Sequence, residues 1–249
     1  MDLGRWLTER SISQAPVHID VREGGMAIEN AAGIAGCNSG GATGSALCRI
    51  VSISRLNMIL ECTIEEYLAE LERQSTQAQA LTDGLDEAAL NWQPDGGKAW
   101  SVAQCIEHLS ATNAFYLAAI RGAVERNEDQ IPRGPGIYRP AGWPSRKFIQ
   151  SMEPESKRKF RTFRKIAPAT SQYRRDQVLS QFVTKQKDLA EFVSKSSEMD
   201  LGSLRFHNPF LKGVHLTVSS GLLLIGAHNR RHLRQAENVK KDAEFPRAS

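Results

Sequence analysis

Hydrophobic residues recur at helical spacing in four segments of the chain after residue 57. In the first, which begins at Cys62, Glu and Gln fill much of one side, while the apolar positions form a stripe: Ile64, Tyr67, Leu68, Leu71, Ala78, Leu81 and Leu85. Steps of three and four residues are typical of an amphipathic helix that buries one face. We therefore predict a first long helix that starts at Cys62.

A second helix is predicted to begin at Ser101 and to run to about Arg126. Gln104 follows Ser101 by three residues, which is the spacing of a capping box, and the preceding polar sequence NWQPDGGKAW indicates a turn. The inward stripe of this helix holds Cys105, His108, Thr112, Phe115 and Ala119. His108 is therefore expected on the buried face.

The third and fourth helices are predicted near Asp176–Ser197 and from about Thr217, a residue suited to cap the fourth. The stripe of the third helix holds Val178 or Leu179, Phe182, Gln186, Leu189 and Val193. The stripe of the fourth holds Ile225, His228, His232, Gln235 and Val239. His228 and His232 are about one helical turn apart, so both rings project from the same buried face.

The segments between these helices show no alternating pattern of a β-strand. The sequence IPRGPGIYRPAGWPSRK, residues 131–147, is predicted to be a loop because its prolines lack backbone donors and fix φ. Long loops often border binding sites. The predicted fold class is all-α: a four-helix bundle with long connecting loops, a class that builds metal sites from side chains on facing helices.

Residues 1–57 differ from the rest of the chain in composition. They contain no Lys, Phe or Tyr and are rich in Gly, Ala and Ser. So few large apolar groups cannot offset the entropy lost on ordering. We predict a mostly disordered leader at 1–57, followed by the helical domain at 58–245.

Two alternatives exist for this leader. The sequence IAGC, Ile34 to Cys37, resembles a lipoprotein processing site, but Glu23 and Glu29 interrupt the apolar core that such a signal needs. Alternatively, the natural start is Met58. Expression from Met58 is then expected to give a protein of undiminished stability.

Bulk properties favour a cytoplasmic protein. The net charge of +4 and the pI near 8.9 do not require a nucleic-acid partner. The four cysteines show no C-x-x-C spacing and are too few for a disulfide scaffold in 249 residues. No apolar run approaches the ~18–20 residues of a membrane span, so no membrane association is predicted.

Three histidines on inward stripes, His108, His228 and His232, suggest a metal site. Buried imidazoles without partners leave polar nitrogens unpaired at about 1–3 kcal/mol each, and a divalent cation removes much of that cost. A core of hydrogen-bonded histidines is the alternative. Neutral imidazoles suit Zn, Ni, Fe or Cu, and three protein ligands with an open position are typical of catalytic sites.

Other motifs are incomplete or ambiguous. The metalloprotease motif H-E-x-x-H needs Glu where this chain has Asn229, and GGATGS at 40–45 lacks the Lys of a P-loop. Gln235 either hydrogen-bonds a ligand nitrogen or caps the core. The remaining histidines, His18, His207 and His215, are expected in loops or tails. Of these, His207 or His215 could lie close to the mouth of the site.

The segment Lys157–Arg175 holds eight basic residues and no acidic ones, interleaved with Phe160, Phe163 and Tyr173. Such a composition can neutralise phosphates and stack bases. With an overall charge of only +4, we favour instead a solvated cationic loop that shields one end of the bundle. Nucleic acid is not the expected partner.

Three motifs resemble those of the DinB/YfiT-like superfamily of bacterial metal-binding four-helix bundles. They are W-S at Trp100 and Ser101, E-H-L at Glu107–Leu109, and H-N-R-R-H-L-R-Q at His228–Gln235. The resemblance covers roughly Thr63 to Lys241. It implies one divalent metal ion, Zn or Ni with Fe or Mn as alternatives, held by His108, His228 and His232 in a dimeric cytoplasmic protein.

The resemblance also implies activities. Characterised relatives include S-transferases that use low-molecular-weight thiols and a mycothiol-dependent isomerase, and others are described as metal-dependent hydrolases. A thiol in the open metal position becomes a thiolate, whereas a water there falls in pKa toward ~7. We expect thiol transfer to an electrophilic substrate. The alternatives are a hydrolase that uses metal-bound water and a non-catalytic metal-binding stress protein whose basic loop contacts nucleic acid.

Overall fold

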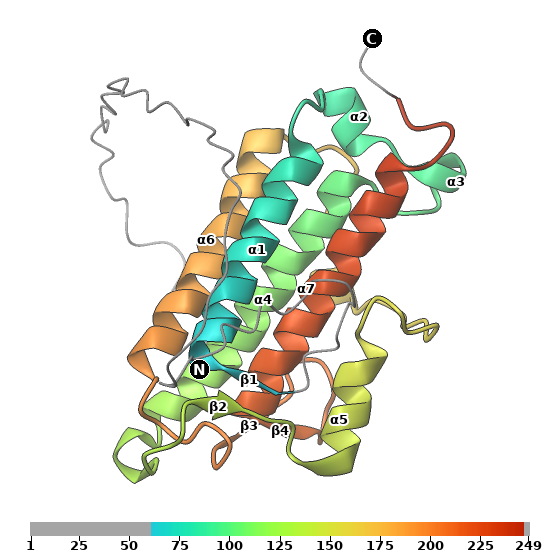
Figure 1. Ribbon diagram of the computed structural model, residues 1–249. Helices are drawn as coiled ribbons and strands as arrows, with labels where there is room; N and C mark the ends of the chain where they lie inside the picture. Colours follow the sequence, from blue (N-terminus) through green and yellow to red (C-terminus); the bar gives the residue numbers. More distant parts are fainter. Residues whose placement is uncertain (1–60, 247–249) are drawn as a thin grey trace, which may run out of the picture. The chain divides into compact units, whose positions relative to one another are not determined.

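The computed structural model describes residues 61–246, which are mostly helical, as the predicted all-α class requires (Figure 1). The predicted leader at 1–57, the IAGC sequence and the possible start at Met58 lie outside the described residues. Four long helices lie side by side in Figure 1: α1 (Ile64–Thr82), α4 (Val102–Glu125), α6 (Arg175–Lys195) and α7 (Val218–Lys240). The shorter helical elements are α2 (Glu87–Asn91), α3 (Pro94–Gly97), α5 (Gly142–Ser151), η2 (Glu128–Gln130) and η3 (Arg164–Ile166).

Side-chain caps fix where three of the long helices begin. Ser101 accepts from the backbone N–H of Gln104, whose side chain accepts from the backbone N–H of Ser101 in return. Thr63 forms the same capping box with Glu66 at the start of α1. Thr217 caps α7. Each cap satisfies N–H groups that have no partner within the helix, and the predicted starts at Ser101 and Thr217 are confirmed.

Two positions of the predicted stripes are wrong. Leu85 does not belong to the first helix, because α1 ends at Thr82 and Gly84 adopts a φ of +69°, which stops the helix. Phe115 is 39% exposed, and its neighbour Tyr116 is the buried residue. Phe115 and Tyr116 lie three and four residues after Thr112, so helical spacing alone allows either ring to face inward. In the structure, the packing of α4 buries Tyr116.

The interior contains two apolar clusters separated by a layer of buried amides. One cluster joins the start of α1 and of α7 to the ends of α4 and α6, and the other joins the opposite halves of the same helices. Between them, each long helix contributes one amide side chain: Gln74, Asn113, Gln186 and Asn229. These amides bond to one another over 2.8–3.3 Å. Since a buried polar group must find a partner, the layer favours one register of the four helices.

The connection after α4 is not the loop that its prolines predicted. It contains α5, and residues 137–138 form β2 (Ile137–Tyr138), which pairs antiparallel with β1 (Cys62–Thr63). Pro144 is tolerated because it lies in the first turn of α5, where backbone N–H groups have no helical partner.

A second short pair, β3 (Arg205–His207) and β4 (His215–Thr217), lies at the same end of the long helices as β1 and β2 (Figure 1). Strands of two and three residues are too short to leave an alternating pattern in the sequence. Within residues 61–246, none of the helices has the length and apolar character needed to cross a bilayer.

Candidate metal centre

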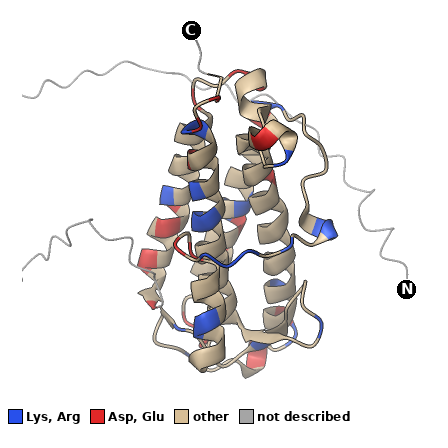
Figure 2. Ribbon diagram, turned by 90° about the vertical axis from the view of Figure 1, so that its right-hand side faces the viewer, with Lys and Arg blue, Asp and Glu red and all other residues tan. Residues whose placement is uncertain are grey.

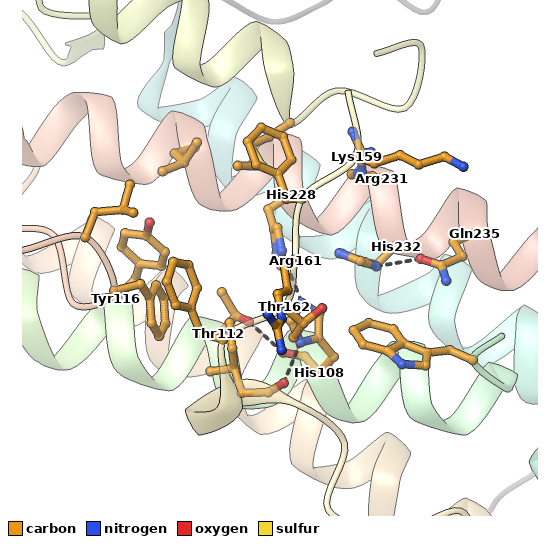
Figure 3. A pocket seen from close by; sticks show the side chains of 18 of the residues that line it. His108, Thr112, Tyr116, Lys159, Arg161, Thr162, His228, Arg231, His232 and Gln235 are labelled. Carbon is orange, nitrogen blue, oxygen red and sulfur yellow. Dashed lines mark hydrogen bonds between the residues drawn. The ribbon is translucent and has the colours of Figure 1, made fainter. Parts of the chain in front are cut away.

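The three predicted histidines come together between α4 and α7. His108 projects from α4, and His228 and His232 project from successive turns of α7 (Figure 3). The ring centroid of His108 lies 5.0 Å from that of His228 and 4.6 Å from that of His232. One ligand atom from each residue can be chosen so that all three lie within 4.8 Å of one another. Among the described residues this trio could hold a metal ion.

Hydrogen bonds to two of the rings set which nitrogen faces the centre. His108 Nδ1 donates to the backbone carbonyl of Ile166 over 2.7 Å, and His232 Nδ1 donates to Gln235 Oε1 over 2.8 Å. A neutral imidazole has one proton, so Nε2 of both rings keeps its lone pair. The bond between His232 and Gln235 matches one of the two roles predicted for Gln235, a hydrogen bond to a nitrogen of a histidine ligand.

The third ring, His228, lacks such a partner. Its Nδ1 is buried with no hydrogen-bond partner within residues 61–246, and its Nε2 lies 3.2 Å from Nε2 of His108. Two imidazole Nε2 atoms at this distance either share one proton in a hydrogen bond or both bind the same cation.

Burial keeps all three imidazoles in the neutral form that metals bind. Desolvation lowers the pKa of His108, and desolvation together with its two histidine neighbours lowers the pKa of His228 well below the usual value. Desolvation, then His108, lowers the pKa of His232 to about 3. At neutral pH each ring therefore offers a lone pair without first losing a proton.

The donor set fits a divalent cation. Zn–N bonds of ~2.0–2.1 Å place two nitrogens of a tetrahedral site roughly 3.3–3.4 Å apart, and the Nε2 atoms of His108 and His228 are 3.2 Å apart. Three neutral imidazoles are a ligand set that Zn, Ni and Fe accept. The carbonyl of Ile166 and the amide of Gln235 would orient two of the ligands, as outer partners of metal-bound histidines commonly do.

The histidines line a cavity of about 670 Å³, a volume that suits a small molecule. Trp100 closes one side, with its ring centroid 4.8 Å from that of His108 and 5.6 Å from that of His232. In the sequence, Trp100 stood out only as part of the W-S motif, and not as a residue of the site. Tyr116 and Phe210 also line the cavity, and their positions carried no signal in the sequence.

The basic segment lies over this cavity and not at one end of the bundle, which corrects the sequence prediction. We call residues 157–166 the strap; Figure 2 shows its blue ribbon crossing the long helices. Lys159 to Phe163 line the cavity, and Ile166 bonds His108. The strap is held in place because its Arg158 carbonyl accepts from Arg231 of α7 over 2.6 Å.

The other candidate residues lie apart from the centre. His207 and His215 are exposed, face each other on β3 and β4 with ring centroids 4.2 Å apart, and do not line the cavity. Cys62 and Cys105 are buried free thiols, and burial raises the pKa of Cys62 to about 12. Thiols kept protonated in this way are poor nucleophiles. His18 lies outside the described residues.

Comparison with known proteins agrees with the residue motifs. A comparison with curated proteins finds no match. The family model of the DinB superfamily matches residues 70–236, which is well over half of the chain and includes all three histidines. The chain belongs to the DinB superfamily.

Proposed function

We propose that His108, His228 and His232 bind one divalent cation, Zn or Ni with Fe or Mn as alternatives, and that α1, α4, α6 and α7 form the four-helix bundle that carries it. The observation that supports this most strongly is the neutral trio itself. Two of its rings have Nδ1 tied to oxygen acceptors, which leaves Nε2 free as a ligand, and Nε2 of the third ring lies 3.2 Å from Nε2 of His108. Three protein ligands leave a coordination position for a substrate.

We propose further that the protein joins a low-molecular-weight thiol to an electrophilic small molecule: the sulfur forms a C–S bond, the leaving group of the electrophile departs with its electron pair, and the thiol proton passes to solvent. A bound divalent cation supplies Lewis acidity, which favours the anionic form of a thiol or of a water that reaches it. Trp100 and the strap would shield that position from bulk water. The chain's own task would be to orient the ligand histidines through Ile166 and Gln235 and to hold the second substrate in the cavity.

The cavity lining favours thiol transfer over hydrolysis. None of its described residues is Asp or Glu, so no carboxylate is available as the general base that commonly assists attack by water. Thiolate attack needs no such base. Hydrolysis remains the second candidate, and the homodimer, the cytoplasmic location and a non-catalytic stress role remain predictions from the sequence.

The test is turnover of monochlorobimane by zinc-loaded or nickel-loaded full-length protein, with and without a small thiol. We expect thiol-dependent conjugation above the spontaneous rate, lost in His108→Ala and retained in the matched variant His215→Ala. Parallel assays with an activated ester would report hydrolysis. Ester turnover without thiol, together with no conjugation, would replace transfer by hydrolysis.

A further inference from the structure

The walls of the cavity carry uncompensated positive charge. Its lining includes Lys98, Lys159, Arg161 and Arg231 but no acidic residue. Lys98, Lys159 and Arg161 form no ion pair with any other residue of the described part of the chain, although this part contains many carboxylates. Because the overall charge is only +4, the cavity is a local concentration of charge.

Arg231 contributes to this charge in a fixed position. Its guanidinium donates to the backbone carbonyls of Ser151, Glu153 and Arg158 over 2.6–3.4 Å. Carbonyl groups bind the guanidinium but do not neutralise it. Arg231 thus anchors the start of the strap and adds a positive charge one residue from His232.

The far end of the cavity is apolar and aromatic. Along α4, Tyr116 lies eight residues from His108, about 12 Å at the rise of an α-helix. There Phe210 packs edge-on against Tyr116 at 5.4 Å and stacks on Phe163 of the strap at 5.6 Å. In Figure 3 Tyr116 lies on one side of His228, and Lys159 and Arg231 lie on the other.

We propose that the cavity selects amphipathic organic anions. The apolar body would occupy the end formed by Tyr116, Phe163 and Phe210. A carboxylate or comparable anionic group would lie among Lys98, Lys159 and Arg161, beside the histidines. Uncompensated charges around a partly enclosed, low-dielectric space attract ions of opposite sign, and Arg and Lys form strong charge-assisted hydrogen bonds with carboxylates. This proposal rests on the proposed function, because it identifies the substrate class of the same site.

The test compares two ligands of nearly equal size and shape, the anionic 4-phenylbutyrate and the neutral 4-phenylbutanamide, by calorimetric titration into zinc-treated full-length protein. We expect the carboxylate to bind about tenfold more tightly than the amide at low salt. The double variant Lys159→Gln/Arg161→Gln is expected to remove most of this preference and to leave amide binding unchanged. Both residues are exposed, so the fold should persist, which a melting temperature equal to that of the wild type would verify.

The matched control is Arg164→Gln/Lys165→Gln, which removes the same charge from the same strap at exposed positions outside the cavity lining. It should keep the preference. Equal binding of both ligands by the wild type would overturn the proposal. So would an equal loss of the preference for the carboxylate in the two double variants. Zinc content is measured on the same samples. If the protein binds no zinc but still prefers the carboxylate, the proposed function is contradicted while the proposed preference for anions is retained.

Discussion

At the scale of single residues, the site depends on histidines that stay neutral. Water stabilises an imidazolium ion, and burial removes that water from His108, His228 and His232. Without metal, the same property makes the folded state sensitive to acid. The unfolded chain binds a proton on each histidine near pH 6.5, whereas the folded chain does not.

We therefore expect the free energy of unfolding of chelator-treated protein to fall as pH drops below about 6.5. A folded-state pKa below that of the unfolded state means that the unfolded state binds more protons, with a slope of up to about 1.4 kcal/mol per pH unit for each histidine. For His232 the loss continues toward pH 3, near its folded pKa. Urea unfolding between pH 7.5 and 5 measures this slope.

A matched pair of variants assigns the slope to the site. His232→Gln removes one of the buried rings and should make the pH dependence shallower. His207→Gln removes an exposed ring outside the cavity and should leave it as it is. A wild-type slope near zero in this range would show that the three imidazoles are not held neutral.

Among helical elements, α7 packs closely on its neighbours at one glycine and not at another. A Cβ at Gly221 would lie 2.7 Å from two ring atoms of Phe206, whereas a Cβ at Gly226 would meet Tyr67 and Arg230 at 3.5–3.7 Å, ordinary contact distances. Gly221→Ala is expected to destabilise the protein by about 1–3 kcal/mol. Gly226→Ala should be neutral or stabilising by up to about 1 kcal/mol through helix propensity. Thermal unfolding compares the two, and equal effects would contradict this packing.

An ion-pair cluster joins α1 and the residues after α5 to α7. Arg230 contacts Glu153 through two nitrogens, at 2.6 and 3.0 Å, and Glu70 at 2.9 Å, and both carboxylates are buried. Arg230→Met would leave two buried charges without this partner, so we expect a loss of about 3–5 kcal/mol in the free energy of unfolding. The control Arg234→Met breaks a more exposed pair with Glu237 and should cost at most about 1 kcal/mol. Similar losses in both variants would show that the cluster contributes no more than a surface pair.

The long helices and the histidine trio could be predicted because both depend on local signals. Capping residues at Ser101 and Thr217 and steps of three and four residues determine which side chains face inward. His108, His228 and His232 fall on those stripes, so their convergence required only that α4 and α7 be neighbours.

The remaining features depend on contacts between distant segments. The sequence gives no local reason for residues 157–166 to cross the cavity; Arg231 and His108 bind carbonyls of that segment from two other helices. The choice of Tyr116 over Phe115 as the buried ring follows from its packing against Phe206 and from the hydrogen bond that Asn208 donates to its hydroxyl group. Helix α5 was missed because proline usually indicates a loop, yet a helix accepts it in the first turn.

For the whole molecule, the four long helices lie side by side (Figure 1), and residues of α4, α7 and the strap line one cavity (Figure 3). The buried amide layer lies between the two apolar clusters, in the part of α4 and α7 that also carries the histidines. This layer favours a single register of the helices. A fixed register is what brings imidazoles from two helices within bonding range of one cation.

The most direct test of this account is the metal content of purified full-length protein after dialysis, measured for the wild type, for His108→Ala, His228→Ala and His232→Ala, and for the control His215→Ala. We expect one divalent ion per chain in the wild type and the control. Each ligand variant should retain far less, because loss of a ligand should weaken binding by more than the ~100-fold seen for outer partners. A wild type without metal, or ligand variants that keep a full equivalent, would contradict the central claim.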